Sequence, residues 1–180
     1  MTPVTVRAVK RNISKFLAAA VIAAGFGAAA IPAHAQNAVT LTATDSGLSQ
    51  WAHIVQLAGL VQAAQTNNVT VFAITNKGFD RVNKVYSNAL MSPGSMGSPH
   101  FMRMQSLVMS QAVLGLHPMS EFDGKKVTLT SVAGTPLEID GTTQGKLVIK
   151  GAYTTTELTG QPLTSSQAVI YPVTVLHVHQ

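Results

Sequence analysis

The chain of 180 residues contains no cysteine, which excludes disulfide bonds, thiolate nucleophiles and cysteine-ligated zinc sites. It also has few charged residues, 11% of the total. Neither a G-x-S-x-G elbow nor an S-x-x-K motif occurs. The carboxylates are scattered among polar turns and strand edges, so no pair suited to acid–base catalysis is indicated. We therefore expect a protein that is not an enzyme and that needs no cofactor.

The N-terminal residues have the pattern of a secretory signal peptide. A basic stretch precedes the apolar run 16–30, and His34 lies within an A-x-A cleavage site that ends at Ala35. The run is too short for a membrane span, and no second hydrophobic segment follows. We expect residues 1–35 to be removed and residues 36–180 to form one domain, periplasmic or secreted, with no transmembrane segment.

Cleavage at that site also changes the charge of the protein. It removes four of the twelve Lys and Arg residues and none of the seven acidic ones, so the mature chain is close to neutral. The formal charge of +5 is therefore mainly a property of the leader, and it gives no reason to expect a nucleic-acid partner.

The chain is organised around the stretch 69–79. Val69 to Ile74 is a short run rich in β-branched and apolar residues, which predicts a buried strand. Thr75 or Asn76 can then cap a helical turn that carries Phe79 and Val82. A rigid strand-to-helix corner is expected here.

This stretch resembles the first signature of the fasciclin domain, T-V-F-A-P-T-N-x-A-F. It departs from the signature at Ile74, where the family usually has Pro, and at Gly78, where the family usually has Ala. The segment 166–176 resembles the second signature in its hydrophobic pattern. The residues that match the first signature are Thr70, Val71, Phe72, Ala73, Thr75, Asn76 and Phe79.

The order of the remaining elements is also similar to that family, and it predicts an α+β fold. We expect a helix over 48–64 capped by Asp45 or Ser46, an exposed Gly/Ser/Pro-rich loop over 91–100, and a second helix over 101–116. From Lys125 the period changes to two, with a turn at Asp140-Gly141. The resemblance implies N-terminal helices packed on a twisted, mainly antiparallel sheet of short strands.

Proline and histidine mark two further positions. Pro172 lacks an amide donor, so its strand is expected at a sheet edge or at a bulge. Leu116-His117 stands where the family has a Tyr-His pair, so the histidine is present and the tyrosine is absent.

The resemblance implies a module for adhesion and extracellular interaction. We expect a noncovalent partner that is a protein, glycan or lipid of the cell envelope or extracellular space. Rigid scaffolds commonly present function on loops, so the candidate binding residues are His117, Pro118 and Met119 in one loop, with Ser98 and His100 in the other. The alternative is that His117 only closes a polar contact and that the second loop is a connector.

A different hypothesis is periplasmic copper(I) binding. Thioether and imidazole ligands suit soft copper(I), and five such residues lie within one stretch. The alternative is that these methionines only pack. A second pair, His177 and His179, would lie on one face of a strand, but at a chain end where fraying is expected. The candidate ligands in the first stretch are Met91, Met96, His100, Met102 and Met104.

A third hypothesis is the carriage of an apolar ligand between helices and sheet. The apolar composition is compatible with it, although a protein core accounts for the same residues.

Overall fold

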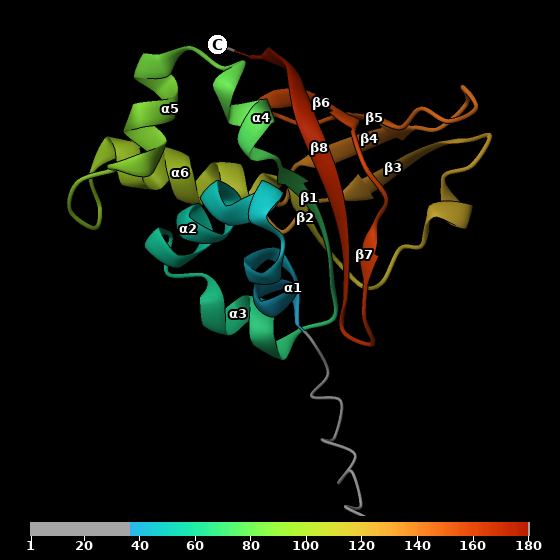
Figure 1. Cartoon of the computed structure of the whole chain (residues 1–180), viewed down its shortest axis with the longest axis horizontal. Helices are drawn as coiled ribbons and strands as arrows, with labels where there is room; N and C mark the ends of the chain where they lie inside the picture. The colour runs from blue at the N-terminus through green and yellow to red at the C-terminus, as the bar shows by residue number, and fades with distance from the viewer. Residues whose placement is uncertain (1–36, 180) are drawn as a thin grey trace, which may run out of the picture. The chain divides into compact units, whose positions relative to one another are not determined.

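A computed structural model describes residues 37–179 of the chain (Figure 1). The expected signal peptide, residues 1–35, lies outside the described residues. Figure 1 shows the helices α1 to α6 on one side of the strands β1 (Val69–Ile74) and β8 (Ala168–Val178), with β3 to β6 on the other side. The helical elements are α1 (Ala38–Thr44), η1 (Ser46–Leu48), α2 (Ser49–Leu57), α3 (Val61–Thr66), α4 (Asn76–Asp80), α5 (Lys84–Met91), α6 (Pro99–Ser110) and η2 (Met119–Glu121).

The strands form one sheet with the order β2-β1-β8-β6-β5-β4-β3, and β7 also pairs with β8. Every pairing is antiparallel except that of β1 with β8. This confirms the predicted α+β fold with a mainly antiparallel sheet. The strands are β1 (Val69–Ile74), β2 (Ala112–Leu114), β3 (Lys126–Thr130), β4 (Pro136–Asp140), β5 (Val148–Lys150), β6 (Thr154–Leu158), β7 (Leu163–Thr164) and β8 (Ala168–Val178).

The predicted corner after β1 is confirmed. All six residues of β1 are buried, as its β-branched and apolar composition predicts. Thr75 caps α4, because its hydroxyl accepts a hydrogen bond from the Gly78 amide at 3.1 Å. Phe79 lies within α4 and Val82 follows it, and both side chains are buried.

Asn76 joins this corner to the preceding helices. Its side-chain oxygen accepts a hydrogen bond from the Gln50 amide at 3.0 Å. Its amide group donates to the Ser46 carbonyl at 2.8 Å and to the Ser49 hydroxyl at 3.0 Å. One side chain therefore holds α4, η1 and α2 together, which a capping role alone does not predict.

The prediction of one helix over 48–64 is wrong. The segment contains the end of η1, then α2 and α3, and the break lies at Gly59, where φ is +70°. That left-handed conformation is readily adopted by glycine and ends a helix. The chain also has an earlier helix, α1, which the sequence did not predict. Its cap is Asn37, whose side chain accepts from the Thr40 amide at 3.0 Å.

The prediction of a helix over 101–116 is also wrong at its C-terminal end. The helix α6 ends at Ser110, and the next residues form β2. This strand pairs with β1, with Val113 opposite Thr70. The apolar residues beyond Ser110, although they continue the helical spacing, therefore pair with a strand that lies far away in the sequence.

The position of Pro172 differs from the prediction of an edge strand or a bulge at that residue. Its strand, β8, lies between β1 and β6, and the bulge in β8 lies further along, where Thr155 and Thr156 of β6 face His177 and Val175. The pairing of β6 ends at Val173 and that of β7 begins at Ile170. Pro172 pairs with Ala73 on the β1 side, but on the other side of β8 it lies in the gap between the β7 and β6 pairings, where a missing amide donor costs no ladder hydrogen bond.

The core continues on both sides of β1. Val69 and Val71 face the helices, while Phe72 packs against Phe122 and Tyr171.

Within residues 37–179, no helix has both the length and the apolar character that a membrane crossing needs.

Candidate functional site

The loop that follows β2 carries the predicted residue His117 and is held by two strands. The His117 amide donates to the Thr70 hydroxyl of β1 at 2.9 Å. The Tyr171 hydroxyl of β8 donates to the His117 carbonyl at 2.8 Å. Burial, followed by the negative charge of Glu121, raises the pKa of the Tyr171 hydroxyl, so this group remains a donor. The backbone of His117 is therefore fixed from both sides.

The ring of His117 is also engaged within the protein. Its Nδ1 lies 2.7 Å from Oε2 of Glu121, and its Nε2 lies 3.1 Å from the Leu114 carbonyl oxygen. Both partners are acceptors, so the imidazolium form satisfies both contacts at once. The ring also stacks on Phe122, with centroids 6.5 Å apart. This arrangement is the polar contact that the alternative to a binding role requires.

We expect His117→Ala to lower the free energy of unfolding by about 1 kcal/mol, because a partly exposed hydrogen bond to Glu121 and a contact with the Leu114 carbonyl are lost. Thermal denaturation of this variant beside His53→Ala, which changes an exposed histidine of α2, measures the difference. Unchanged stability combined with lost partner binding would instead assign His117 to the binding surface.

The other predicted binding residues lie in different settings. Pro118 is exposed and Met119, half-buried, begins η2. Ser98 caps α6, accepting from the Phe101 amide at 3.2 Å and donating to the Pro93 carbonyl at 2.6 Å. His100 is exposed on the first turn of α6. The structure brings none of the 117–119 residues into the hollow that His100 lines.

The five candidate copper ligands are not brought together. Met96 is 84% exposed in the loop and Met102 is 51% exposed on α6, whereas Met104, also on α6, is 0% exposed. A ligand buried in the core cannot share an ion with one that faces solvent on another side of the helix. Met91 packs against the core and His100 is exposed. Among residues 37–179, no group of three or more His, Cys, Asp or Glu side chains could hold a metal ion.

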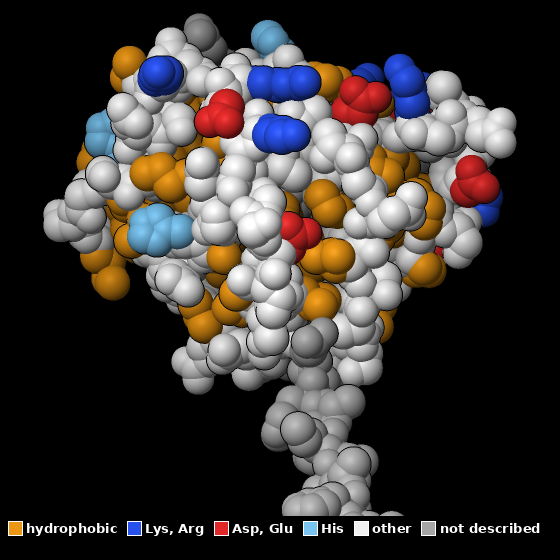
Figure 2. Space-filling view, viewed as in Figure 1, with side chains coloured by type: hydrophobic (Ala, Val, Ile, Leu, Met, Phe, Trp, Pro, Cys, Tyr) orange, Lys and Arg blue, Asp and Glu red, His pale blue; other side chains and the backbone are white. Residues whose placement is uncertain are grey.

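A larger feature, which we call the basic groove, lies between the end of β8 and the helices α5 and α6. Its volume is about 880 Å³. Figure 2 shows Lys, Arg and His side chains along the edge where α4, α5 and the end of β8 lie in Figure 1. The groove is lined by Arg81, Val82, Asn83, Val85, Tyr86, Ala89, Leu90, His100, Arg103, Tyr153, Val175, Leu176, His177, Val178 and His179.

The bulge in β8 shapes one wall of this groove. Because the extra residue, Leu176, interrupts the alternation, both Leu176 and His177 are exposed. The chain end is held in place, since the His179 amide donates to the Tyr153 carbonyl at 2.8 Å. The rings of His177 and His179 lie edge to face, with centroids 5.3 Å apart. The two imidazoles thus share one face, as predicted, and β8 continues through Val178.

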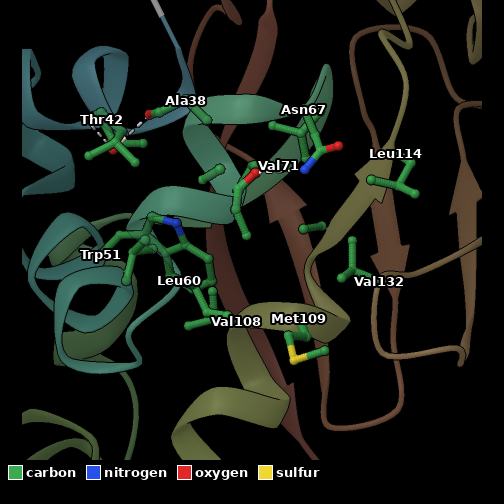
Figure 3. A pocket seen from close by; sticks show the side chains of 16 residues that line it. Ala38, Thr42, Trp51, Leu60, Asn67, Val71, Val108, Met109, Leu114 and Val132 are labelled. Atoms are coloured by element: carbon green, nitrogen blue, oxygen red, sulfur yellow. Dashed lines mark hydrogen bonds between the residues drawn. The ribbon is translucent and has the colours of Figure 1, made fainter.

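A second hollow, which we call the apolar cavity, lies between α1, α2, α3, α6 and the strands β1 and β2 (Figure 3). Its volume is about 110 Å³. The lining polar side chains Thr42 and Asn67 are satisfied by nearby groups, Thr42 by the Ala38 carbonyl at 2.9 Å and Asn67 by the Ala63 carbonyl at 2.9 Å. Trp51 also lines the cavity and is 1% exposed.

The Trp51 indole differs from the other polar side chains that line this cavity, because its N–H has no hydrogen-bond partner among the described residues of the protein. Figure 3 shows its nitrogen on the side of the ring that faces the other lining residues. Within the described part of the chain this N–H donates to no protein group, and it is not one of the fully buried polar atoms that lack a partner, so it borders open space. An apolar ligand with one acceptor atom could therefore complete it.

Among the described residues, the carboxylates that form hydrogen bonds or ion pairs do so in a way typical of structural contacts. Asp140, for example, accepts from the Thr142 hydroxyl at 2.6 Å and from Lys126 Nζ at 2.9 Å. These hydrogen bonds, that from Thr142 first, lower the pKa of Asp140 to about 2, so it is a poor proton acceptor near neutral pH.

Sequence reasoning identified His100, His177 and His179 but missed the rest of the basic groove and the apolar cavity. The arginines and tyrosines of the basic groove are far apart in the sequence: Arg81 follows α4, Tyr86 lies in α5, Arg103 lies in α6 and Tyr153 precedes β6. Only the packing of these elements brings them together. A signal was present in the sequence, since the stretch 81–103 contains Arg81, Lys84 and Arg103 together with His100, and no acidic residue.

Comparisons with known proteins agree with this architecture. The family model of the Fasciclin domain matches residues 46–176 of the chain. Among solved structures, the chain is similar to a FAS1 domain pair from the insect cell adhesion molecule fasciclin I, with a TM-score of 0.66 and 12% sequence identity. The match covers 79% of this chain and 51% of that one, so the chain spans about half the length of the domain pair. No curated protein sequence matches the chain.

Proposed function

Because the chain belongs to the fasciclin family, we propose that it is an exported, non-enzymatic binding module that makes noncovalent contacts with a partner in the cell envelope or extracellular space. The observation that carries this proposal is that the fasciclin domain occupies residues 46–176, nearly all of the chain that follows the leader. The similar insect protein is a cell adhesion molecule, which favours adhesion as the purpose of such binding.

The leader pattern supports export. If the full chain is expressed in a bacterial host, we expect the purified extracellular or periplasmic protein to begin at Gln36, and mass spectrometry of its N-terminal peptide measures this. Protein that is found only in the cytoplasm with Met1 intact would contradict export.

A pull-down from native envelope and culture fluid tests the binding function. The mature protein is compared with the variant Met96→Ser, which removes the one large side chain of the exposed loop stretch 94–97 and leaves the Ser98 cap in place. Mass spectrometry of the retained proteins, glycans, lipids and metals identifies the partner. Failure of the wild-type protein to retain any of these above an unrelated exported protein would contradict the proposal. Retention of copper alone would move the function to metal binding.

The apolar cavity favours a second candidate function, the carriage of a small apolar molecule. Its volume of about 110 Å³ is smaller than that of a benzene-binding cavity, which measures about 150 Å³, so it takes at most a single ring or a short chain and not a whole lipid. Trp51 supplies one unpartnered donor within it.

We expect anisole, which has one acceptor oxygen, to bind more tightly than toluene, which has none, and Trp51 fluorescence reports both because it is the chain's one tryptophan. Ala64→Leu should abolish binding by filling the cavity that Ala64 lines. Gln62→Leu places the same side chain on an exposed position of the same helix and should leave binding unchanged. Equal, weak responses in all three proteins would contradict this function.

A further inference from the structure

The basic groove carries positive charge that the protein does not neutralise. Arg81 and Arg103 both line it, and neither forms an ion pair among residues 37–179. By contrast, Lys126 and Lys146 on the sheet are paired with Asp140 and Glu157. No aspartate or glutamate is among the residues that line the groove. An anion that enters it therefore meets cations and no carboxylate.

The groove also contains aromatic and hydrogen-bonding groups beside those cations. Tyr86 is half-buried, and its hydroxyl lies close enough to Arg103 and Tyr153 for both to influence its pKa, which burial raises. His100, His177 and His179 add exposed imidazole rings. Tyrosine and histidine present flat apolar faces together with polar atoms.

Exposed apolar side chains complete the surface. Val85 is 77% exposed and Leu176 is 49% exposed, and both line the groove. The volume of about 880 Å³ is near the upper end of the range for ligand sites, so it accommodates several linked rings. A ligand that matches this lining combines negative charge, hydrogen-bonding groups and flat apolar faces.

We propose that the basic groove binds an acidic oligosaccharide built from uronic acid units. The arginines pair with the carboxylates in bidentate geometry, and the tyrosine and histidine rings contact the faces and hydroxyls of the sugars. This inference rests on the proposed binding function and deepens it by naming the class of partner.

Isothermal titration calorimetry with the mature protein tests the inference. The probes are tetragalacturonate and tetramannuronate, and maltotetraose is the neutral control of equal length. We expect at least one acidic probe to bind, maltotetraose to bind at least about tenfold more weakly, and the affinity to fall as salt is raised.

The variant Arg81→Gln/Arg103→Gln should lose at least about tenfold in affinity for the acidic probe. The matched control is Lys125→Gln/Lys150→Gln, which removes the same charge from exposed positions that do not line the groove. Circular dichroism establishes that both variants are folded. In NMR spectra, the acidic probe should shift the amide signals of Tyr153 and of 177–179.

Three results would overturn the inference. One is that neither acidic probe binds more tightly than maltotetraose. Another is that both double variants weaken binding equally, which indicates attraction by net charge alone. The third is binding to phosphatidylglycerol vesicles that tetragalacturonate and tetramannuronate do not compete away, which assigns the groove to a membrane surface. A partner recovered by the pull-down alongside any of these results would leave the proposed binding function intact.

Discussion

Gly141→Ala is expected to lower the free energy of unfolding by about 3 kcal/mol or more. Gly141 follows β4, and a methyl group placed on it would overlap the carbonyl oxygen of Phe122. The two segments cannot simply separate, because the Gly141 amide donates to the Lys125 carbonyl at 2.8 Å and the Gly124 amide donates to the Gly141 carbonyl at 3.0 Å. Phe122 itself is fully buried. The substitution therefore displaces a core aromatic residue or breaks this junction.

Urea denaturation followed by the fluorescence of buried Trp51 measures the loss. Gly160→Ala is the matched control, because the nearest neighbour of a methyl group there is Pro172 at an ordinary 3.8 Å. We expect this control to change the stability by less than about 1 kcal/mol. Similar urea midpoints of unfolding for the two variants would show that the segment around Phe122 can move at little cost in free energy, and would contradict the prediction.

Phe72→Ala should cost about 3–5 kcal/mol, because a large side chain that is fully buried is removed and a cavity remains. The Phe72 ring stacks on Tyr171 with centroids 5.3 Å apart, and it lies 6.5 Å from the Phe122 ring. Its loss also weakens the support of Tyr171, whose hydroxyl holds the His117 loop.

Thermal unfolding of Phe72→Ala is compared with that of Phe72→Leu, which retains most of the volume and should lose much less. If the two variants were equally stable, the aromatic cluster would not be the centre of the core. In Phe72→Ala, the NMR signals of His117 should shift as well, because the perturbation passes through Tyr171.

The same glycines show how far local sequence reasoning extends. The turn at Asp140-Gly141 was predicted from turn chemistry, but the stronger constraint on Gly141 is the close approach of Phe122. Gly78, where similar domains usually have alanine, has a comparable constraint, since a methyl group would lie 2.9 Å from Cγ2 of Ile74 and 3.2 Å from the Thr174 backbone. These contacts depend on β8, which joins the sheet from the far end of the chain.

The corner at 69–79 could be predicted because its determinants are local. A β-branched strand and a hydroxyl cap lie next to each other in the sequence, and the structure confirms both. The C-terminal half of the predicted helix 101–116 failed because Val113 meets a partner more than forty residues away, Thr70. The spacing of apolar residues cannot distinguish a helix face from a short strand that pairs with a distant one.

The candidate site shows the same difference between local and distant determinants. His117 and His100 were identified as residues, but their roles depend on what surrounds them. His117 is held by Glu121, Leu114 and Tyr171, whereas His100 lies in a groove with unpaired arginines. The composition of one segment does not determine which of these settings a histidine occupies.

The parallel pairing of β1 with β8 bears on the order of events during synthesis. Val69 to Ile74 pair with Ala168 to Val173, so the central contact of the sheet joins residues about a hundred positions apart. Without β8, the pair β2-β1 and the group β6-β5-β4-β3 have no connection through the sheet. The fold therefore cannot close until almost the whole chain has left the ribosome, and contacts of such separation also form slowly. For a protein that we propose is exported, this delay favours translocation before the sheet has closed.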